Sequence, residues 1–191
     1  MACKHKRPVG ASWRMDETYI KVKGALVIRD LVEADVAAFF ALLQDKAVFD
    51  GCPDSLLATE GSARAALFGP APMTRALVAV VDGKLVGMAA YYMIFSTFIM
   101  QPGLWLDDLY LDAAQRGKGI GRAMMTQLCA IANEHGCARV DWTVASRNQD
   151  GRRFYTRLGA NISEQLQLCR LGAAAIDRLA IEHAASGTTA Q

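Results

Sequence analysis

The segment from Gln115 to Met125 reads QRGKGIGRAMM. It combines glycines, which have no side chain, with positively charged residues just before an expected helix. Glycines alternate in it with cationic side chains, namely Arg116, Gly117, Lys118, Gly119, Gly121 and Arg122. The first amides of a helix have no intrahelical acceptors and carry partial positive charge, so they suit an anionic oxygen. The cations beside them suit a diphosphate more than a carboxylate. The alternative interpretation is a flexible connection whose charges are solvated.

Three phosphate-binding patterns can be compared with this segment. The nucleoside triphosphate loop requires Gly-x-x-x-x-Gly-Lys followed by Ser or Thr, and the chain does not contain it. The dinucleotide fingerprint Gly-x-Gly-x-x-Gly fails, because Arg122 stands at its last position when the count starts at Gly117. Asp141 follows about 24 residues later, near the place of a ribose-binding acid, and keeps a nicotinamide-dependent oxidoreductase open as an alternative. The third pattern, Gln/Arg-x-x-Gly-x-Gly/Ala, is matched in full by RGKGIG at residues 116–121.

The composition of the whole chain does not indicate a polymer, such as a nucleic acid, as a partner. The chain has 191 residues, of which 52% are hydrophobic and 21% charged, and its net charge is +2. These values fit neither a disordered tail nor a strongly basic nucleic-acid binder, and one domain is the simplest expectation. The apolar run Leu85–Met100 falls short of the roughly 20 residues of a membrane-spanning helix and favours a buried strand or strand pair. We therefore expect no nucleic acid and no membrane as partners.

The five cysteines predict neither a disulfide framework nor a metal centre. Their number is odd, no two are spaced as Cys-x-x-Cys, and no secretory leader is recognised, so a reducing cytoplasm is the expected setting. His135 and Cys137 are a close pair of potential metal ligands, and such a pair is far short of the three or four ligands that zinc requires. No metal is therefore expected.

The elements that must position the loop are predicted from apolar spacing and turn residues. Residues 1–24 show no clear periodicity and are expected to form a flexible arm ahead of a single domain at residues 25–191. Asp82-Gly83 joins two β-rich runs, as in a tight antiparallel hairpin. Strands are further predicted at 25–30, 104–111, 138–145 and 165–170, and helices at 33–44, 55–68, 122–135, 151–159 and 173–184. The glycine loop thus belongs to a β-loop-α-β unit.

Around this loop the chain resembles the GNAT superfamily of acetyl-CoA-dependent N-acetyltransferases. The resemblance covers about residues 25–179 and is strongest at residues 91–160, which include LWLDDLYLDAAQRGKGIGRAMM and GCARVDWTVASRNQDGRRFYTRLGA. These segments look like the branch of the diamine (spermidine/spermine) and thialysine acetyltransferases. The resemblance implies an α/β (mixed α+β) fold of the GNAT type, with a central, mixed, mostly antiparallel sheet flanked by helices. It also implies acetyl-CoA as cosubstrate and a homodimer.

The family's coenzyme-binding roles can be carried over residue by residue. The strand before the loop, here Leu109 and Leu111, would pair through its backbone with the pantetheine arm. The loop amides would meet the pyrophosphate, and they belong to Arg116, Gly117, Lys118, Gly119, Ile120, Gly121 and Arg122. The family's Asn-x-x-Ala-x-x-Phe-Tyr matches Asn148 to Tyr155, which would place Asn148 on the coenzyme and Tyr155 near its sulfur. Gly151 replaces the usual alanine and would loosen the start of that helix by up to about 1 kcal/mol.

Tyr155 and Asp107 are the residues expected to carry the chemistry. Attack of an amine on a thioester expels a thiolate, and a phenol with a pKa of about 10 stays protonated at neutral pH and can donate to it. An alkylamine of similar pKa arrives protonated, so the site must bind an ammonium and then accept its proton. Asp107 stands where the diamine branch carries a catalytic glutamate, and its shorter side chain suggests a relay through water. Asp108 is assigned to the amine with it, although neighbouring strand residues face opposite sides.

The chain is therefore predicted to transfer the acetyl group of acetyl-CoA directly to a primary amine, such as a polyamine or a lysine-like small molecule. Without the resemblance, Tyr155 is better explained as a core aromatic residue, and the aspartate pair as a solvated strand end. Two functions from other classes remain open. One is a nicotinamide-dependent oxidoreductase, and the other is a catalytically silent acetyl-CoA-binding module.

Overall fold

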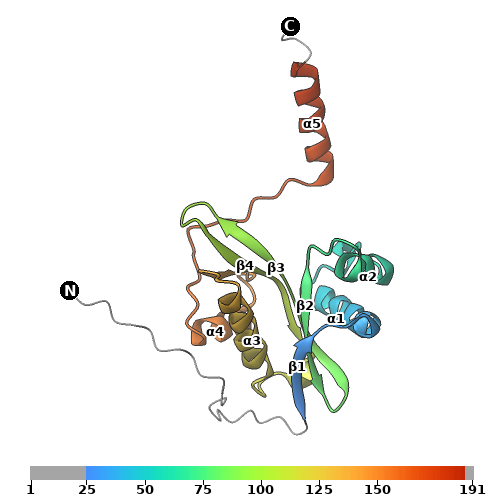
Figure 1. Cartoon of the computed structure of the whole chain (residues 1–191), viewed down its shortest axis with the longest axis vertical. Helices are drawn as coiled ribbons and strands as arrows, with labels where there is room; N and C mark the ends of the chain where they lie inside the picture. The colour runs from blue at the N-terminus through green and yellow to red at the C-terminus, as the bar shows by residue number, and fades with distance from the viewer. Residues whose placement is uncertain (1–24, 188–191) are drawn as a thin grey trace, which may run out of the picture. The chain divides into compact units, whose positions relative to one another are not determined.

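The structure, a computed structural model, describes residues 25–187. The arm predicted at residues 1–24 lies outside the described residues. The chain divides between Thr143 and Val144 into two compact units. Their helices and strands are drawn in Figure 1.

The first unit is built on one five-stranded sheet in the order β1-β2-β3-β4-β5. Its strands are β1 (Leu26–Asp30), β2 (Arg75–Val81), β3 (Lys84–Ser96), β4 (Gln101–Leu111) and β5 (Val140–Asp141). Neighbouring strands run antiparallel, except that β4 and β5 are parallel. The sheet is thus mixed and mostly antiparallel, as predicted.

A two-residue turn joins β2 to β3, with Val81 paired to Lys84. Asp82 and Gly83 both have positive φ angles, 50° and 79°. This combination is typical of the type I′ turn, whose twist matches that of the flanking antiparallel strands. The Asp-Gly hairpin predicted from the sequence is confirmed.

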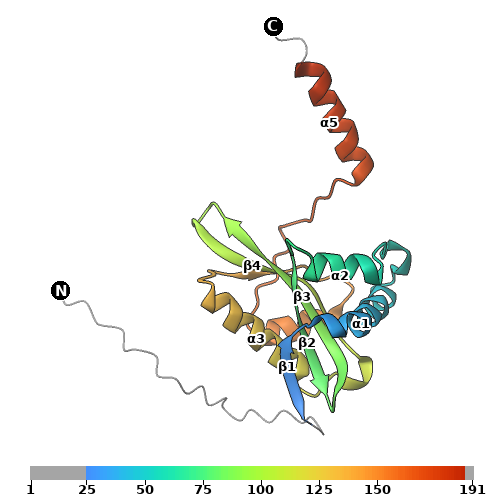
Figure 2. The ribbon, with the colours of Figure 1, turned by 45° about the vertical axis from the view of Figure 1, so that its right-hand side comes forward.

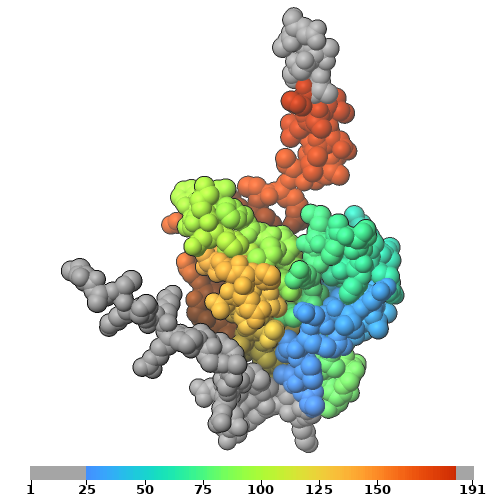
Figure 3. Space-filling view, in the orientation of Figure 1, coloured from blue at the N-terminus to red at the C-terminus, as the bar shows by residue number. Residues whose placement is uncertain are grey.

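The apolar run Leu85–Met100 forms most of β3 and the turn that follows it. That turn lies at the surface (Figure 3), where Phe98 and Met100 are 98% and 72% exposed. Along residues 25–187, no helix is long and apolar enough to cross a membrane. The run is therefore a strand that ends in an exposed apolar tip.

Three helices flank the sheet of the first unit: α1 (Val36–Phe49), α2 (Glu60–Phe68) and α3 (Ile120–Glu134). Short 3-10 helices lie at Glu33–Asp35, Pro53–Ser55 and Ala113–Gln115. Figures 1 and 2 show α1 and α2 on one side of β2 and α3 on the other. Both faces of β2 are accordingly buried, since Leu77 and Val78 point to opposite sides and are 1% and 0% exposed.

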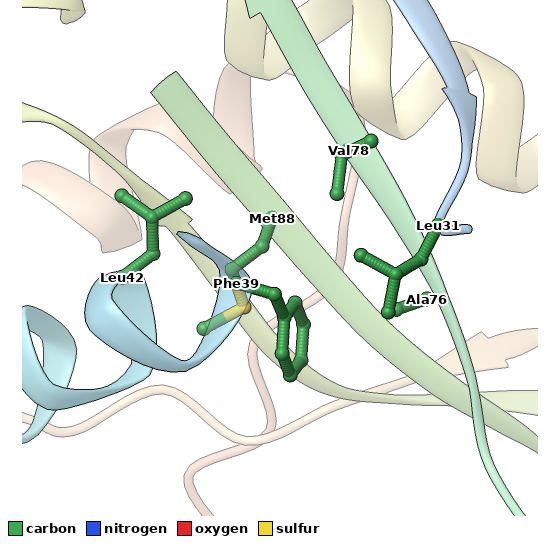
Figure 4. Close-up of a cluster of buried hydrophobic side chains, with 6 residues drawn as sticks. All are labelled: Leu31, Phe39, Leu42, Ala76, Val78 and Met88. Atoms are coloured by element: carbon green, nitrogen blue, oxygen red, sulfur yellow. The ribbon is translucent and has the colours of Figure 1, made fainter. Parts of the chain in front are cut away.

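An apolar cluster fixes α1 against the sheet (Figure 4). Its buried members are Leu31, Phe39, Leu42, Ala76, Val78 and Met88. Phe39 and Leu42 are three residues apart on α1 and share one helix face, while Val78 and Met88 are cross-strand partners. Truncating Phe39 to alanine is expected to cost about 3–5 kcal/mol, so this cluster holds the N-terminal half of α1 in a defined place.

Helix α2 begins at Glu60, so the predicted start at Ser55 is wrong. Thr59 caps the helix: its Oγ1 accepts a hydrogen bond from the Ser62 N–H at 3.1 Å, and the Ser62 Oγ accepts one from the Thr59 N–H at 2.8 Å. This reciprocal pair satisfies backbone donors that the helix itself cannot. Serine at the third helical position is a weaker signal than the usual Glu or Gln, which is why the sequence did not reveal the boundary.

The second unit contains two helices, α4 (Gln149–Arg157) and α5 (Ala173–Gly187), both close to their predicted places. The strand predicted at residues 165–170 is wrong, because residues 144–187 contain no strand. Leu166 and Leu168 alternate with polar residues as in a strand but are 81% and 64% exposed, without a neighbouring strand in this unit. In the first unit, the strand predicted at 138–145 shortens to the two residues of β5 that pair with β4.

Candidate functional site

The glycine loop leads from β4 into helix α3 through two glycines in the left-handed region. Gly117 has a φ of 75°, and Gly119, the N-terminal cap of α3, has a φ of 88°. Residues with a Cβ rarely adopt this conformation, so the turn itself requires glycine. The Ala123 N–H donates to the Gly119 carbonyl at 3.0 Å as α3 begins. The amides ahead of it form the open helix N-terminus, and they belong to Ile120, Gly121 and Arg122.

The side chain of Arg116 is folded against two aromatic rings. Its guanidinium carbon lies 4.4 Å from the ring centre of Phe49 and 5.5 Å from that of Tyr110. Its Nε donates to the Leu111 carbonyl at 3.1 Å. Each cation–π contact of this kind contributes roughly 0.5–1 kcal/mol at an exposed site. Arg116 thus fastens the loop to the end of α1 and to β4.

The other two loop cations have different surroundings. Lys118 Nζ donates to Gln115 Oε1 at 2.8 Å and so stays within the loop. Arg122 is exposed on the first turn of α3, beside the open amides. A diphosphate at this helix N-terminus would therefore meet backbone donors together with the charge of Arg122.

Within residues 25–187, one edge of β4 has no strand partner beyond Trp105. The pairing of β4 with β5 is limited to Leu104 and Trp105, whereas its pairing with β3 continues to Leu111. Leu109 and Leu111 therefore pair with β3 but not with β5. Backbone groups on an unpaired strand edge are available to an extended ligand, so this edge can accept the amide groups of a coenzyme arm.

A β-bulge makes Asp107 the extra residue of β4. Ala90 pairs with Asp108 and Tyr91 with Leu106, and Asp107 lies between these two pairs without a partner of its own. Bulges interrupt the alternation of strand faces and redirect side chains. The expectation that the two neighbouring aspartates face opposite sides therefore fails.

The register of β3 places both aspartates on one face of the sheet. Tyr92 pairs with Trp105, and Ala90, two residues earlier on β3, pairs with Asp108, so Trp105 and Asp108 share a face. Trp105 in turn holds Asp107, because its Nε1 donates to Asp107 Oδ1 at 3.2 Å. The bulge thus brings two carboxylates together at the same side of β4.

Asp107 is exposed and lies beside two aromatic rings. Trp105 stacks on Tyr92 with ring centres 6.5 Å apart. Burial and the negative charge of Asp107 raise the pKa of the Tyr92 phenol, which therefore stays neutral. Within residues 25–143, no cationic side chain forms an ion pair with Asp107. An ammonium placed here would meet a carboxylate and an aromatic face.

Asp108, by contrast, already has a cation of the chain as its partner. Lys46 Nζ, on α1, lies 2.7 Å from Asp108 Oδ1 and 2.6 Å from Asp50 Oδ2. Burial acts to lower the pKa of Lys46, but the hydrogen bonds to Asp108 and Asp50 outweigh it, and the pKa is raised. Lys46 therefore keeps its positive charge, which Asp108 and Asp50 share.

In the second unit, Asn148 and Tyr155 lie at the start and near the end of α4. Asn148 caps the helix, and its Oδ1 accepts a hydrogen bond from the Gly151 N–H at 2.9 Å. A Cβ on Gly151 would lie only 2.7 Å from Asn148 Nδ2, so glycine is what leaves room for this cap. Tyr155 is half-buried, with its ring centre 5.1 Å from that of Phe154. The cap occupies the Asn148 oxygen and leaves its Nδ2 as the donor for a ligand.

Sequence reasoning missed Lys46, Trp105 and Phe49. The spacing of Lys46 and Asp50, four residues apart on a helix, was a visible signal for an ion pair, but the contact with Asp108 spans two distant segments. Trp105 and Asp107 are two apart on a strand, which could have indicated a shared face. Among the described residues, no group of three or more His, Cys, Asp or Glu could hold a metal ion.

Comparison with known proteins identifies the family to which the chain belongs. The family model described as "Acetyltransferase (GNAT) family" matches residues 31–160. Thialysine N-epsilon-acetyltransferase from Sus scrofa is 27% identical over 144 residues, which are 71% of this chain and 84% of the relative. Spermine/spermidine N(1)-acetyltransferase from Bacillus subtilis (strain 168) is 28% identical over 88 residues, 44% of this chain and 58% of the relative.

A solved structure shares the arrangement of helices and strands. It is the ribosomal-protein-alanine N-acetyltransferase from Brucella melitensis biovar Abortus, which superposes with a TM-score of 0.62 at 26% sequence identity. The match covers 77% of this chain and 100% of that one. The two chains thus share a fold over most of the length of this chain.

Proposed function

Because the chain belongs to the GNAT family of acetyltransferases, enzymes that use acetyl-CoA as cosubstrate, we propose that its glycine loop binds the pyrophosphate of coenzyme A. The observation that carries the proposal is the turn at Gly117 and Gly119, which presents the open amides of α3. The pantetheine arm would lie along Leu109 and Leu111, on the edge of β4 that β5 leaves unpaired. In the second unit, Asn148 Nδ2 would donate to the coenzyme.

In the proposed reaction, an amine attacks the thioester directly. The nitrogen lone pair forms a bond to the carbonyl carbon, and the carbon–sulfur bond breaks. The proton lost by nitrogen passes to Asp107, directly or through one water, and the departing thiolate takes a proton from the Tyr155 hydroxyl. Asp107 suits its role because it is exposed and has no ion pair within residues 25–143. No covalent enzyme intermediate forms, so the cysteines take no part.

The acceptor we propose is a primary alkylamine on a small molecule. The two curated relatives are named as acetyltransferases of thialysine and of spermine and spermidine, all of them small amines. The site offers such an amine the carboxylate of Asp107 and the stacked rings of Trp105 and Tyr92. These groups attract an ammonium and cover an alkyl stem.

Two measurements test the proposed function. Acetyl-CoA should raise the melting temperature of the protein by binding the folded state, whereas NADH should not. A screen of primary amines should then find acetyl-CoA-dependent release of free thiol. Stabilisation by NADH alone would instead favour a nicotinamide-dependent oxidoreductase. Binding of acetyl-CoA with no thiol release from any amine would favour the catalytically silent module.

A homodimer in the cytoplasm is the proposed state of the protein. Large apolar side chains are exposed on the β3–β4 turn of the first unit, and on the second unit they include Leu166, Leu168, Leu171, Ile176 and Ile181. Exposed apolar groups in such number are typical of an interface, and a two-fold dimer is the simplest closed assembly. The described cysteines, Cys52, Cys129, Cys137 and Cys169, are free thiols, which suits a reducing compartment.

A further inference from the structure

We propose that Lys46 is a specificity-determining residue that removes the advantage a second ammonium group would otherwise give an acceptor amine at the site around Asp107. The inference rests on the proposed function and concerns the same site. Its basis is a row of three carboxylates, Asp107, Asp108 and Asp50, of which the last two share a cation supplied by the chain itself. A polyamine therefore gains no advantage at this site over an amine with an uncharged or zwitterionic far end.

Lys46 occupies the position that a second substrate ammonium would otherwise take. Its Nζ lies between Asp50 Oδ2 at 2.6 Å and Asp108 Oδ1 at 2.7 Å, and its side chain is only 22% exposed. An ammonium held by two carboxylates at these distances is strongly bound and geometrically defined. The stem of Lys46 belongs to α1, which Phe39 and Leu42 anchor in the apolar cluster. The ammonium group of Lys46 is thus held in place by the fold and belongs to the site.

The bulge brings this internal cation close to the carboxylate that receives the acceptor. Asp107 and Asp108 are consecutive, about 3.8 Å apart at their Cα atoms, and both lie on the face of β4 that contacts α1. A second ammonium near Asp108 would lie within the Debye length of about 8 Å from Lys46, where salt does not screen the repulsion. The second charge of a diamine therefore meets Lys46 already placed between Asp50 and Asp108, and at most one net negative charge is left for it.

The experiment compares n-alkylamines with α,ω-diamines of the same length, from ethyl to hexyl, on the full-length protein. Calorimetric titration in the presence of coenzyme A measures their dissociation constants, and thiol release from acetyl-CoA measures kcat/KM. In the wild type, the diamine should be favoured at most about twofold, the statistical factor for its two equivalent ends. In Lys46→Gln the preference should move toward the diamine by roughly tenfold, the scale of a newly available hydrogen bond between an ammonium and a partly buried carboxylate.

Three further variants separate specificity from stability and overall charge. Lys46→Arg keeps the cation and should keep the wild-type preference. Lys84→Gln removes an exposed lysine beside the β2–β3 turn and should leave the preference unchanged, because it alters only the net charge. If Lys46→Gln does not fold because Asp50 and Asp108 then repel each other, the double variant Lys46→Gln/Asp50→Asn removes one of these charges and supports the same comparison.

The outcomes distinguish this inference from the proposed function. A wild-type preference for the diamine well above twofold would overturn the inference, as would an unchanged preference in Lys46→Gln and in the double variant. Failure of every amine to bind would overturn it as well, because Asp107 would then hold no ammonium. If acetyl-CoA does not raise the melting temperature of the wild type, that result would instead contradict the proposed coenzyme site and with it the proposed function.

Discussion

At the scale of residues, two neighbouring aspartates of β4 have been given different surroundings. Asp108 is 20% exposed and paired with Lys46, while Asp107 is exposed and contacts the Trp105 indole. A carboxylate that must bind an ammonium and later accept its proton cannot be occupied by a permanent cation. The division into an ion-paired carboxylate and an exposed one accompanies the bulge, which a sequence alone does not show. Asp107 is therefore the aspartate on which the kinetic test should be made.

We predict that Asp107→Asn and Tyr155→Phe impair the enzyme in different ways. Tyr155→Phe removes the proposed acid, so acetyl-CoA should still bind while kcat falls by roughly 100-fold or more. Asp107→Asn removes both the proton acceptor and the charge that attracts the amine, so it should lower kcat and raise the KM of the amine together. The measurement is kcat and KM for both variants on the best amine of the screen.

The pH dependence separates the two roles further. An alkylamine with a pKa of about 10 becomes increasingly deprotonated between about pH 7 and pH 9.5, so the need for a proton acceptor declines. Raising the pH should therefore partly restore Asp107→Asn and leave Tyr155→Phe impaired, since the departing thiolate still lacks its donor. Equal recovery of both variants, or wild-type rates in the tyrosine variant, would show that the acid is misassigned.

At the scale of elements, the parts that the sequence predicted are those with local causes. The Asp82-Gly83 turn and the glycines before α3 follow from backbone conformations that few residues can adopt. The bulge at Asp107 could not be predicted, because it depends on how β4 pairs with β3. The strand at residues 165–170 was predicted from alternation alone, and alternation gives no strand where a unit offers no neighbouring strand.

A valine at Gly119 should weaken coenzyme binding, and Gly136 supplies the matched control. Both glycines lie at ends of α3 with positive φ angles, 88° and 65°, so Gly119→Val and Gly136→Val impose similar backbone strain. Both variants should lose stability, by about 1–2 kcal/mol. In calorimetric titration, however, Gly119→Val alone should raise the dissociation constant of acetyl-CoA. Equal affinity of the two variants would remove the loop from the coenzyme site.

Two glycines near helix N-termini should respond in opposite ways to alanine. A Cβ on Gly61 of α2 meets nothing closer than Thr59 Oγ1 at 3.8 Å, so Gly61→Ala should raise the free energy of unfolding by about 0.5–1 kcal/mol. A Cβ on Gly151 of α4 meets Asn148 Nδ2 at 2.7 Å, so Gly151→Ala displaces the cap, at a cost of about 0.5–2 kcal/mol.

Denaturant titration of both glycine variants provides the measurement. Gly151→Ala should give no gain in stability and should raise the KM of acetyl-CoA, because Asn148 is the proposed coenzyme contact. Stabilisation of both variants to the same degree would show that Asn148 can yield to the extra methyl group without losing its cap.

At the scale of the whole molecule, the exposed apolar surface bears on assembly. Leu166 and Leu168 follow a strand-like alternation yet are 81% and 64% exposed. A segment with this pattern is stabilised when it pairs with a strand, and a second copy of the chain can supply one by two-fold symmetry. The sequence anticipated the alternation but assigned the strand to the single chain. Pairing between two copies of the chain would account for both the strand-like alternation of this segment and the exposure of its leucines.

Light scattering should therefore give the wild type a mass of about twice the 20.7 kDa of one chain at micromolar concentration. The double variant Leu166→Asp/Leu168→Asp places charge on the alternating segment and should shift the mass toward that of one chain, because an unpaired charge in an interface is costly. Leu57 is 89% exposed in the first unit and lies away from that segment in the sequence, so Leu57→Asp is the matched control and should remain dimeric. A wild-type mass near 20.7 kDa would refute the dimer, and dimers in the double variant would move the interface away from residues 166–168.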